Sequence, residues 1–290
     1  MTHGTEQQLW RSGAHILRCP VCGDEPSATE TGLRCPRGHV FDRARQGYVS
    51  LLTGRGSGHR SDTAPMVAAR RRILDSGMFD AVANALAAAI PRDTGVVVDA
   101  GTGTGHYLAA ALGAAPAALG IGIDLSKYCA RAAAKAHPRA LAVVADLWEP
   151  LPLGDGVADA VLSVFAPRNA AEVARILAPG GCWLIVTPNP GHLHEVREAL
   201  GMLDIGADKL VRLHDELAAA GFRVTETIPV TSTADLSAAQ ATDLAGMGPA
   251  GFHRTPGELA AAAAGLTGAT RTVTATVDVV VTVAGIPSAG

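Results

Sequence analysis

After residue 66 the sequence alternates short apolar runs with segments whose composition suits helices. The strand-like runs cover 95–99, 119–124, 141–146, 159–165 and 182–187, and the helix-like segments cover 66–75, 78–90, 106–112, 126–136, 170–177, 192–200 and 209–220. Parallel strands need long crossover connections, which helices usually supply. The alternation therefore predicts a parallel α/β sheet with helices on both faces, completed by the β-rich segments 222–230 and 273–283.

The composition is that of a globular protein. Apolar residues make up 48% and charged residues 18% of the 290 positions, and the net charge is only −3, so we expect a packed core and exclude disorder over the whole length. No apolar run reaches 18 residues, and the N-terminus lacks a signal-peptide pattern. We therefore expect a cytoplasmic protein with reduced thiols and no membrane association.

Three of the five cysteines lie within 17 residues, at Cys19, Cys22 and Cys35, and His39 follows them. The spacing forms two pairs, Cys19 with Cys22 and Cys35 with His39. Each pair can supply two ligands from one tight turn, and the two pairs together can bind a single metal ion. Thiolates and imidazole are the ligands that tetrahedral zinc prefers, and four of them leave no open position. The pattern predicts structural zinc, and the alternative is four unrelated residues in a small core. The other two cysteines are isolated and are interpreted as packing residues.

The front of the chain is basic, whereas the rest is acidic. Residues 1–75 hold 11 Lys and Arg against 7 Asp and Glu, and residues 76–290 hold 13 against 20. This charge suits an anionic partner, although an ordinary solvated surface would also account for it. The candidate phosphate ligands are Arg34, Arg37, Arg43, Arg45, Arg55 and Arg60. Phe41 and Tyr48 lie among them and either stack on RNA bases or form a small core.

These patterns divide the chain into three regions. Residues 1–52 are turn-rich and hold the metal-binding pattern, residues 53–65 are rich in Gly and Ser and predict a flexible linker, and residues 66–290 hold the α/β pattern. A metal-binding segment of this size depends on its metal for stability.

A glycine-rich loop follows the first strand of the α/β region. It begins at Asp99 and contains Gly101, Gly103 and Gly105, which allow a ligand to approach the backbone closely. A dinucleotide site would normally have a third glycine at position 106, where this chain has His106. The loop therefore better suits a zwitterionic ligand that contains adenosine.

Two further acids end the next two strands. Asp124 is placed to accept hydrogen bonds from ribose hydroxyls, and Asp146 from an adenine amino group, with Leu147 or Trp148 covering the ring. A carboxylate only accepts hydrogen bonds, so it suits these donors. The alternatives are that Asp124 caps the following helix and that Asp146 is an ordinary loop acid.

Residues 99–105, Asp124, Asp146 and the Leu-x-Pro-Gly-Gly sequence at 177–181 together resemble class I S-adenosylmethionine-dependent methyltransferases. A narrower resemblance, to the RlmA family of 23S rRNA guanine-N1 methyltransferases, covers about residues 15–285. It rests on CPVCGD at 19–24, LRCPRGHVFDRARQGYVSLL at 33–52, DTAPMVAARRRILDSGMFD at 62–80, VFAPRNAAEVARILAPGG at 164–181 and TPNPGHLHEV at 187–196. That family includes the tylosin-resistance branch of actinomycetes.

This resemblance implies a Rossmann-like class I methyltransferase domain with an N-terminal zinc-ribbon domain, S-adenosylmethionine and Zn²⁺ as cofactors, and a hairpin of 23S rRNA as substrate. It assigns the three clustered cysteines and His39 to zinc, and Gly101, Gly103, Asp124 and Asp146 to the cofactor. MGPAGFHRTP at 247–256 is similar to a family loop near the pocket, with Phe252 in its aromatic position. VFAPRN and HRTP look closer to the actinomycete branch, which favours the guanine of that branch.

Catalytic groups are expected where the fourth and fifth strands end, because ligands bind at the carboxyl ends of parallel strands. Guanine N1 carries a proton, so a base, or donors to the developing O6 anion, would help. We expect Phe165 to stack on the target base, Arg168 or Asn169 to bind O6, and His192 to act as general base. The alternatives are that Arg168 binds phosphate or an acid, and that Asn169 and His192 cap nearby helices.

Two other functions fit the same sequence. One is a small-molecule methyltransferase that keeps a zinc lobe, and the other is a zinc-ribbon RNA-binding protein without catalysis. An NAD-dependent dehydrogenase is disfavoured by His106 and by the Pro-Gly-Gly entry to the fifth strand. A homodimer is left open as the assembly state.

Overall fold

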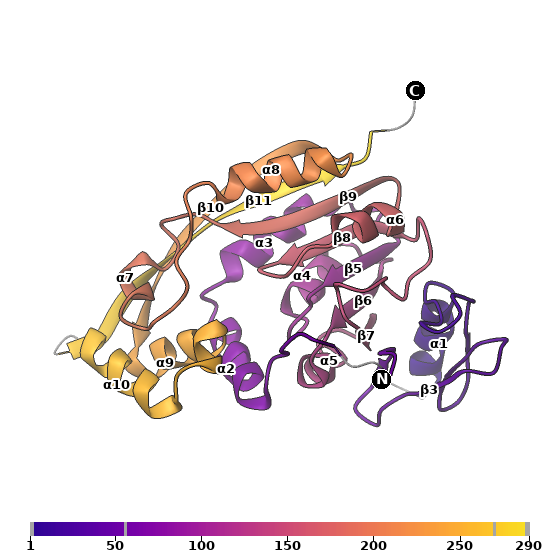
Figure 1. The fold of residues 1–290 in the computed structure, drawn as a ribbon, viewed down its shortest axis with the longest axis horizontal. Coiled ribbons are helices and arrows are strands. Elements are labelled where there is room, and N and C mark those ends of the chain that lie inside the picture. Colours follow the sequence, from indigo (N-terminus) through magenta and orange to yellow (C-terminus); the bar gives the residue numbers. More distant parts are fainter. Residues whose placement is uncertain (1–2, 55–56, 269–270, 288–290) are drawn as a thin grey trace.

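The computed structural model describes residues 3–54, 57–268 and 271–287. An eight-stranded sheet crosses the molecule in the order β10-β11-β9-β8-β5-β6-β7-β4 (Figure 1). Its strands are β4 (Tyr48–Ser50), β5 (Val96–Ala100), β6 (Leu119–Asp124), β7 (Ala140–Val144), β8 (Ala158–Val164), β9 (Leu177–Pro188), β10 (Arg223–Ser237) and β11 (Thr272–Gly285). A smaller sheet near the N-terminus contains β1 (Ser27–Ala28), β2 (Gly32–Arg34) and β3 (Val40–Asp42).

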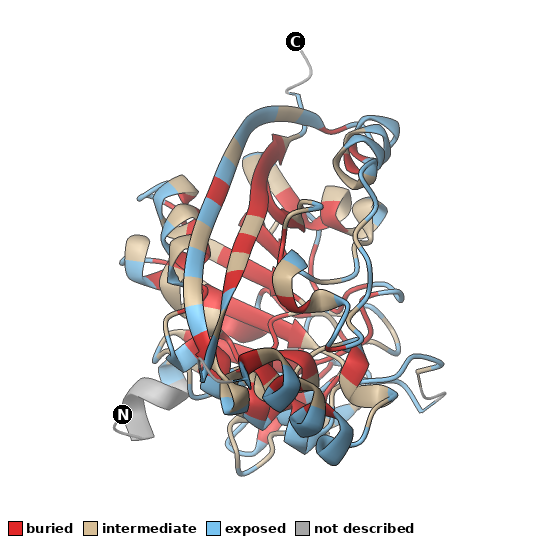
Figure 2. Cartoon of the chain, turned by 90° about the vertical axis from the view of Figure 1, so that its left-hand side faces the viewer, coloured by how far each residue is buried: buried red, intermediate tan, exposed pale blue. Residues whose placement is uncertain are grey.

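Neighbouring strands from β4 through β7, β6, β5 and β8 to β9 run parallel, as predicted. The prediction is wrong at one edge, where β11 runs antiparallel to both β9 and β10. The helical connection after β10 lies at one end of the sheet, so the chain returns beside β10 in the opposite direction (Figure 1). Edge strand β10 is largely exposed and β11 is mostly buried (Figure 2). An antiparallel edge tolerates this because one of its faces can stay solvated.

Helices cover both faces of the sheet, as predicted. One face carries α3 (Asp80–Ala89), α4 (His106–Ala114) and α5 (Lys127–Ala133), and the other carries α1 (His3–Ala14), α6 (Ala170–Ile176) and α8 (Lys209–Ala219). Val97 of β5 packs in the apolar core under α3 and α4, and Val98 packs in the core under α1, α6 and α8, because successive strand residues point to opposite faces. Burial on both faces explains why the central strands are almost continuously apolar.

The remaining helices lie mostly near one end of the sheet. They are α2 (Ala64–Asp75), α7 (His194–Arg197), α9 (Ala238–Gly246), the 3₁₀ helix η1 (Pro249–Phe252) and α10 (Pro256–Thr267). The helix predicted over 192–200 is reduced to α7, because Leu193 before it has a left-handed backbone with φ of 56°. Helices α1, α9 and α10 were not predicted, since α1 is mostly polar and α9 and α10 are rich in Ala, which leaves little apolar periodicity. Within the described ranges, no helix has the length and apolar character needed to cross a membrane.

The N-terminal segment packs closely against the main sheet. Its last strand, β4, pairs with β7, and Leu17 forms an isolated bridge with Leu153. Helix α1 approaches so closely that a Cβ atom on Gly13 would lie 1.9 Å from Cδ1 of Leu141. The first segment, 1–52, thus shares contacts with the sheet of the third, 66–290. The division into 1–52, 53–65 and 66–290 comes from the sequence pattern and stays a prediction.

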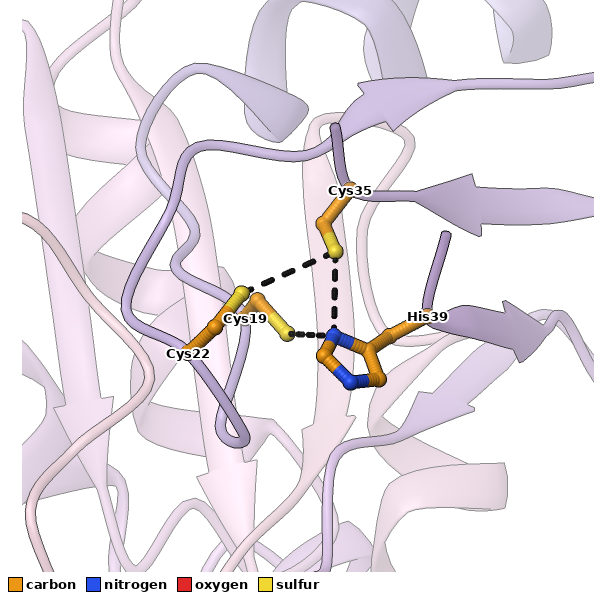
Figure 3. Close-up of side chains that lie close together, drawn as sticks. All are labelled: Cys19, Cys22, Cys35 and His39. Carbon is orange, nitrogen blue, oxygen red and sulfur yellow. Dashed lines mark hydrogen bonds between the residues drawn. The ribbon is translucent and has the colours of Figure 1, made fainter. Parts of the chain in front are cut away.

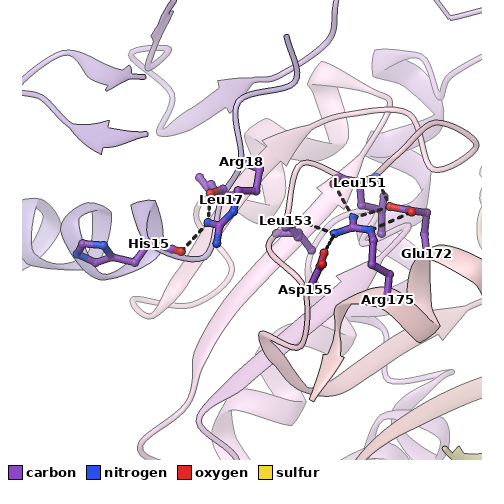
Figure 4. A network of polar contacts seen from close by, with 8 residues as sticks. All are labelled: His15, Leu17, Arg18, Leu151, Leu153, Asp155, Glu172 and Arg175. Atoms are coloured by element: carbon purple, nitrogen blue, oxygen red, sulfur yellow. Dashed lines mark hydrogen bonds and ion pairs between the residues drawn. The ribbon is translucent and has the colours of Figure 1, made fainter. Parts of the chain in front are cut away.

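Two arginines stabilise the junction between this segment and the sheet (Figure 4). The Arg18 side chain donates to the carbonyls of His15 and Leu17 just after α1, and its backbone N–H donates to the Pro152 carbonyl at 2.9 Å. Arg175 of α6 donates to the Leu153 carbonyl at 2.8 Å and forms an ion pair with Glu172 at 2.6 Å. Residues 151–155 are thereby held from both sides.

Candidate functional site

The four predicted metal ligands converge at the small N-terminal sheet (Figure 3). The Nδ1 atom of His39 lies 3.2 Å from Sγ of Cys35 and 3.6 Å from Sγ of Cys19, and Sγ of Cys22 lies 3.7 Å from Sγ of Cys35. All four ligand atoms lie within 4.8 Å of one another. Tetrahedral zinc with Zn–S bonds of about 2.3 Å separates its sulfur ligands by roughly 3.8 Å. The side chains therefore fit the ion without rearrangement.

Two tight turns produce this geometry. The N–H of Gly23 donates to the Cys19 carbonyl at 2.8 Å, and the N–H of Gly38 donates to the Cys35 carbonyl at 2.9 Å. Both glycines have left-handed backbones, with φ of 77° and 87°, which other residues rarely adopt. Each half of the zinc site is thus a local turn, and the β1–β2 hairpin brings the halves together.

The aromatic and basic residues of the zinc segment have different surroundings. Phe41 packs against the core beneath α1 and Tyr48 packs beside α5, which favours the core interpretation of both rings. Among the candidate arginines, Arg34 and Arg45 are exposed, Arg37 pairs with Asp24, Arg43 lies over the Trp10 ring, Arg60 lies over the Phe252 ring, and Arg55 is outside the described residues.

The predicted cofactor loop joins β5 to α4. Gly101 and Gly105 have φ of 89° and 80°. A Cβ atom on Gly101 would lie 2.4 Å from Cβ of Ala166, and one on Gly105 would lie 2.9 Å from Cα of Ala133. Both positions therefore require glycine for backbone angle and for space.

Asp99 lies buried where β5 meets this loop. Its Oδ2 atom accepts a hydrogen bond from the Thr102 hydroxyl at 2.8 Å, whereas its Oδ1 atom has no partner in the described structure. Burial raises the pKa of Asp99 to about 7. A buried oxygen without a donor, next to a loop that only glycine can form, fits a ligand that supplies the donor.

Asp124 ends β6 and reaches back to the same loop. Its oxygens accept the N–H of Gly103 at 2.9 Å and the N–H of Ser126 at 2.8 Å. Ser126, rather than Asp124, is the N-cap of α5. Burial raises the pKa of Asp124 to about 6. A carboxylate has about four acceptor positions, so two stay available for ribose hydroxyls.

His106 begins α4 directly after the loop. Its ring contacts the Tyr107 ring edge-on, with 5.0 Å between centroids, and its Nε2 atom has no partner in the described structure. Burial lowers the pKa of His106, which favours the neutral ring at neutral pH. This position thus carries a polar side chain where a dinucleotide site would have glycine.

Asp146 and Leu147, which are predicted to contact adenine, follow β7. The Asp146 carboxylate accepts the Trp148 N–H at 3.0 Å and the Ser57 hydroxyl at 2.6 Å. Leu147 is buried beside Gly101. A groove of about 1100 Å³ lies between residues 18–23, residues 51–54 with Ser57, and residues 145–155, and Asp146 lines it. Asp146 is itself buried, with 8% of the residue exposed, and none of residues 99–106 lines this groove.

Sequence reasoning missed a set of contacts from the predicted linker. Besides the Ser57 contact with Asp146, the His59 ring lies 5.8 Å from the Trp148 ring. Asp62 forms an ion pair with Arg70 at 2.6 Å, and its carbonyl accepts the Ser126 hydroxyl at 2.6 Å. These partners lie up to 89 residues away in the chain, so no local pattern could have indicated them.

Two predicted catalytic residues meet at the carboxyl edge of the sheet. The Phe165 and His192 rings stack with 5.7 Å between centroids and an interplanar angle of 28°. Phe165 is 42% exposed and has φ of 52°, an uncommon backbone for an aromatic residue. Phe79 supports the Phe165 ring edge-on at 6.0 Å. An exposed ring held on a strained backbone is typical of a functional position.

The hydrogen bonding of His192 defines which atom can react. Its Nδ1 atom accepts the backbone N–H of Asp278 at 3.2 Å. Burial lowers the pKa of His192 to about 4, so the ring is neutral near pH 7. A neutral ring that accepts at Nδ1 carries its proton on Nε2. This geometry favours a hydrogen-bond donor over the predicted general base.

Arg168 and Asn169 are engaged elsewhere. Arg168 forms an ion pair with Glu216 of α8 at 3.1 Å. Asn169 is the N-cap of α6, accepting the Glu172 N–H at 3.3 Å, and its amide donates to the Leu147 carbonyl at 3.2 Å. The structure thus shows the two alternatives weighed from the sequence, an acidic partner and a helix cap.

The strand order, the glycine loop and the acids that end the next two strands define a class I S-adenosylmethionine-dependent methyltransferase that also carries a zinc ribbon. Family models for "RlmA, N-terminal" and "Methyltransferase domain" match residues 17–54 and 97–181. The 23S rRNA (guanine(748)-N(1))-methyltransferase of Streptomyces fradiae is 44% identical over 257 residues, which cover 87% of this chain and 91% of that protein. A Micromonospora griseorubida protein provisionally named 23S rRNA (guanine-N(1)-)-methyltransferase is 44% identical over 271 residues, which cover 86% of this chain and 91% of that protein. The chain belongs to the RlmA family of 23S rRNA guanine-N1 methyltransferases.

A solved structure supports the fold. It is a methyltransferase in complex with the Haloferax volcanii activator Trm112, and it aligns with a TM-score of 0.52 and 24% identity over 79% of this chain and 100% of that one. The family and the described residues agree on S-adenosylmethionine and zinc as the cofactors.

Proposed function

We propose that this chain methylates N1 of a guanine in a hairpin loop of 23S rRNA, and that this guanine is the one at position 748. The specific position is supported by the name of the Streptomyces fradiae relative, which is 44% identical over most of both chains. The observation that carries the proposal is the presence, in one chain, of a preformed zinc site and a glycine loop flanked by Asp99 and Asp124. The proposal includes a cytoplasmic location for the protein and a homodimer as its assembly state.

The cofactor site is proposed to use the residues predicted from the sequence. Asp124 would accept from the ribose hydroxyls and Asp146 from the adenine amino group, with Leu147 against the ring. The unpartnered oxygen of Asp99 supports a role in accepting from the ammonium group of the ligand. S-adenosylmethionine, when bound, supplies an electrophilic methyl group on a sulfonium.

The Phe165–His192 pair is proposed to hold the target base. Phe165 is exposed at the end of β8 and would stack on a base turned out of the hairpin. The N–H at Nε2 of His192 would donate to guanine O6, which gains negative charge as the N1 proton leaves to solvent. Asn169 is proposed as a positioning residue, because its amide holds the Leu147 carbonyl.

Two substitutions separate a donor at His192 from a general base. We expect His192→Gln to keep a substantial part of the methylation rate, since its amide can still donate. His192→Phe should lose about 10²-fold, the usual effect of removing one donor to a developing anion. Equal, complete loss in both variants would support the base instead. Methylation is measured by transfer of labelled methyl groups to a synthetic hairpin.

Primer extension on 23S rRNA tests the reaction itself. N1-methylguanine cannot form a Watson–Crick pair, so reverse transcriptase stops beside it. We expect a stop directly 3′ of guanine 748 in RNA from cells that express this chain, and none from matched cells without it or with Asp124→Ala. A stop directly 3′ of another guanine would overturn the position, and the absence of any stop would overturn the RNA substrate.

A further inference from the structure

A second groove, of about 470 Å³, lies between α2, the start of α4 and α5. Its lining includes three cationic side chains, Arg71, Arg131 and Lys135, and one acid, Asp75. The groove is therefore cationic in a chain whose overall net charge is −3. A concentration of positive charge on an acidic protein marks a surface for an anionic partner.

These cations are not used by the fold. Arg71 lies between Arg70 and Arg72 on α2, and both of those form close ion pairs, at 2.6 Å, with Asp62 and Asp243. In the described part of the chain no ion pair involves Arg71, Arg131 or Lys135, and all three are exposed. Their charges are thus available to a ligand, unlike those of their neighbours.

The cationic surface continues toward the zinc site. Arg131 and Lys135 are four residues apart, which places them on one side of α5 and its end. The turn before β4 touches the same helix, since a Cβ atom on Gly47 would lie 3.4 Å from Cβ of Ala134. Arg45 is exposed on this turn, and α5 lies between the zinc segment and α2 (Figure 1).

At its other end the groove reaches the cofactor loop. Thr104 and His106, which close that loop, also line the groove. A chain of phosphates bound here would therefore run from the zinc segment to the edge of the cofactor site.

We propose that Arg45, Lys135, Arg131 and Arg71 form a basic strip that binds the phosphate backbone of the RNA substrate. This inference rests on the proposed function for the identity of the RNA. Phosphate contacts position a nucleic acid without reading its sequence, so the strip would set the register of the hairpin between the zinc site and the cofactor loop. Arginine suits this role because its planar guanidinium binds phosphate oxygens in pairs.

The test is the salt dependence of RNA binding by the zinc-loaded full chain. We would titrate a fluorescein-labelled synthetic hairpin with wild type and with R71Q/R131Q at several KCl concentrations. Each lost phosphate contact lowers the slope of log K against log salt by about 0.7–0.9, so the double variant should lose about 1.5 in slope and roughly tenfold in affinity at low salt.

The control is R92Q/R223Q, which removes the same charge elsewhere. Arg92 precedes β5, and Arg223 begins β10 opposite Gly285, so both lie at the amino edge of the parallel strands. We expect this variant to keep the wild-type slope. Zinc content and Tm of each variant verify that it is folded. A wild-type slope for R71Q/R131Q, or an equal loss in both variants, would overturn the strip.

Failure of the proposed function looks different. If wild type bound the hairpin but methylated no guanine, the proposed reaction would fall, while the comparison of R71Q/R131Q with R92Q/R223Q would still test the strip. If wild type methylated guanine 748 and both double variants bound equally well, the reaction would stand and the strip would fall.

Discussion

Individual carboxyl groups at the cofactor loop are held in surroundings that disfavour their charge. Asp99 is 1% exposed, and only one of its oxygens has a hydrogen-bond donor. Asp124 receives two backbone N–H donors, yet burial still raises its pKa to about 6. A ligand that brings donors to these oxygens therefore compensates an energetic deficit in the free protein.

The pKa of Asp99, raised by burial to about 7, predicts how stability depends on pH. In the unfolded chain an aspartate has a pKa of about 3.9, so between about pH 4 and 7 only the native state keeps this proton. The free energy of unfolding therefore decreases as pH rises through this window, by up to about 1.4 kcal/mol per pH unit. Asp99→Asn removes the titrating group and should make this decrease smaller.

Urea unfolding at pH 5 and pH 7 measures this difference. We expect the free energy of unfolding of wild type to drop more than that of Asp99→Asn over the interval. Asp93→Asn, at an exposed loop position, serves as the matched control and should follow wild type. Parallel behaviour of wild type and Asp99→Asn would show that Asp99 is ionised in both states.

Several elements end at the residues that form the site. Strand β8 ends just before the strained Phe165, α6 begins at the cap Asn169, and β9 leads to His192. The Asn169 amide connects the start of α6 to the carbonyl of Leu147, which lies beside Gly101. One side chain thus caps the helix and contacts the segment that follows β7.

Substitutions of Asn169 distinguish capping from positioning through Leu147. Asn169→Ala should cost about 1 kcal/mol, the usual value of an N-cap, which lowers Tm by about 2 °C in a chain of this size. Asn169→Ser keeps a capping oxygen but loses the amide that donates to the Leu147 carbonyl, so it should retain Tm while its methylation rate falls as in Asn169→Ala. A Ser variant with both wild-type Tm and wild-type rate would show that Asn169 acts only as a helix cap.

In the whole molecule, the zinc segment and the methyltransferase sheet share one apolar core. Trp10, Leu17, Leu33 and Val49 belong to the same cluster as Leu141 of β7. Strand β4 also covers the edge of β7, which would otherwise expose unpaired backbone groups. The zinc segment is therefore held in a fixed relation to the glycine loop.

A chain that begins at residue 66 tests this coupling. It loses α1 and β4 and exposes apolar side chains whose burial contributes about 1.5–3 kcal/mol each, against a total stability of about 5–15 kcal/mol. We expect it to aggregate on size-exclusion chromatography. The full chain treated with a zinc chelator keeps α1 and β4 and should stay monodisperse. A soluble fragment 66–290 with cooperative unfolding would instead establish the predicted linker as a domain boundary.

The sequence by itself determined the features that depend on near neighbours. The zinc ligands were identified because each pair lies within one turn, and the glycine loop and its acids because they follow buried strands. Periodicity also located the parallel strands, since burial on both faces leaves continuous apolar runs. These signals are local, so no knowledge of packing was needed to find them.

Only the tertiary structure decided the features that join distant segments. It placed β4 beside β7, brought Ser57 to Asp146, and reversed β11 at the sheet edge. It also gave His192 a backbone donor from Asp278, 86 residues away, which assigns the ring proton and changes its chemistry. Such contacts depend on how whole elements pack, because the free energy of a pairing belongs to both partners and is not visible in either segment alone.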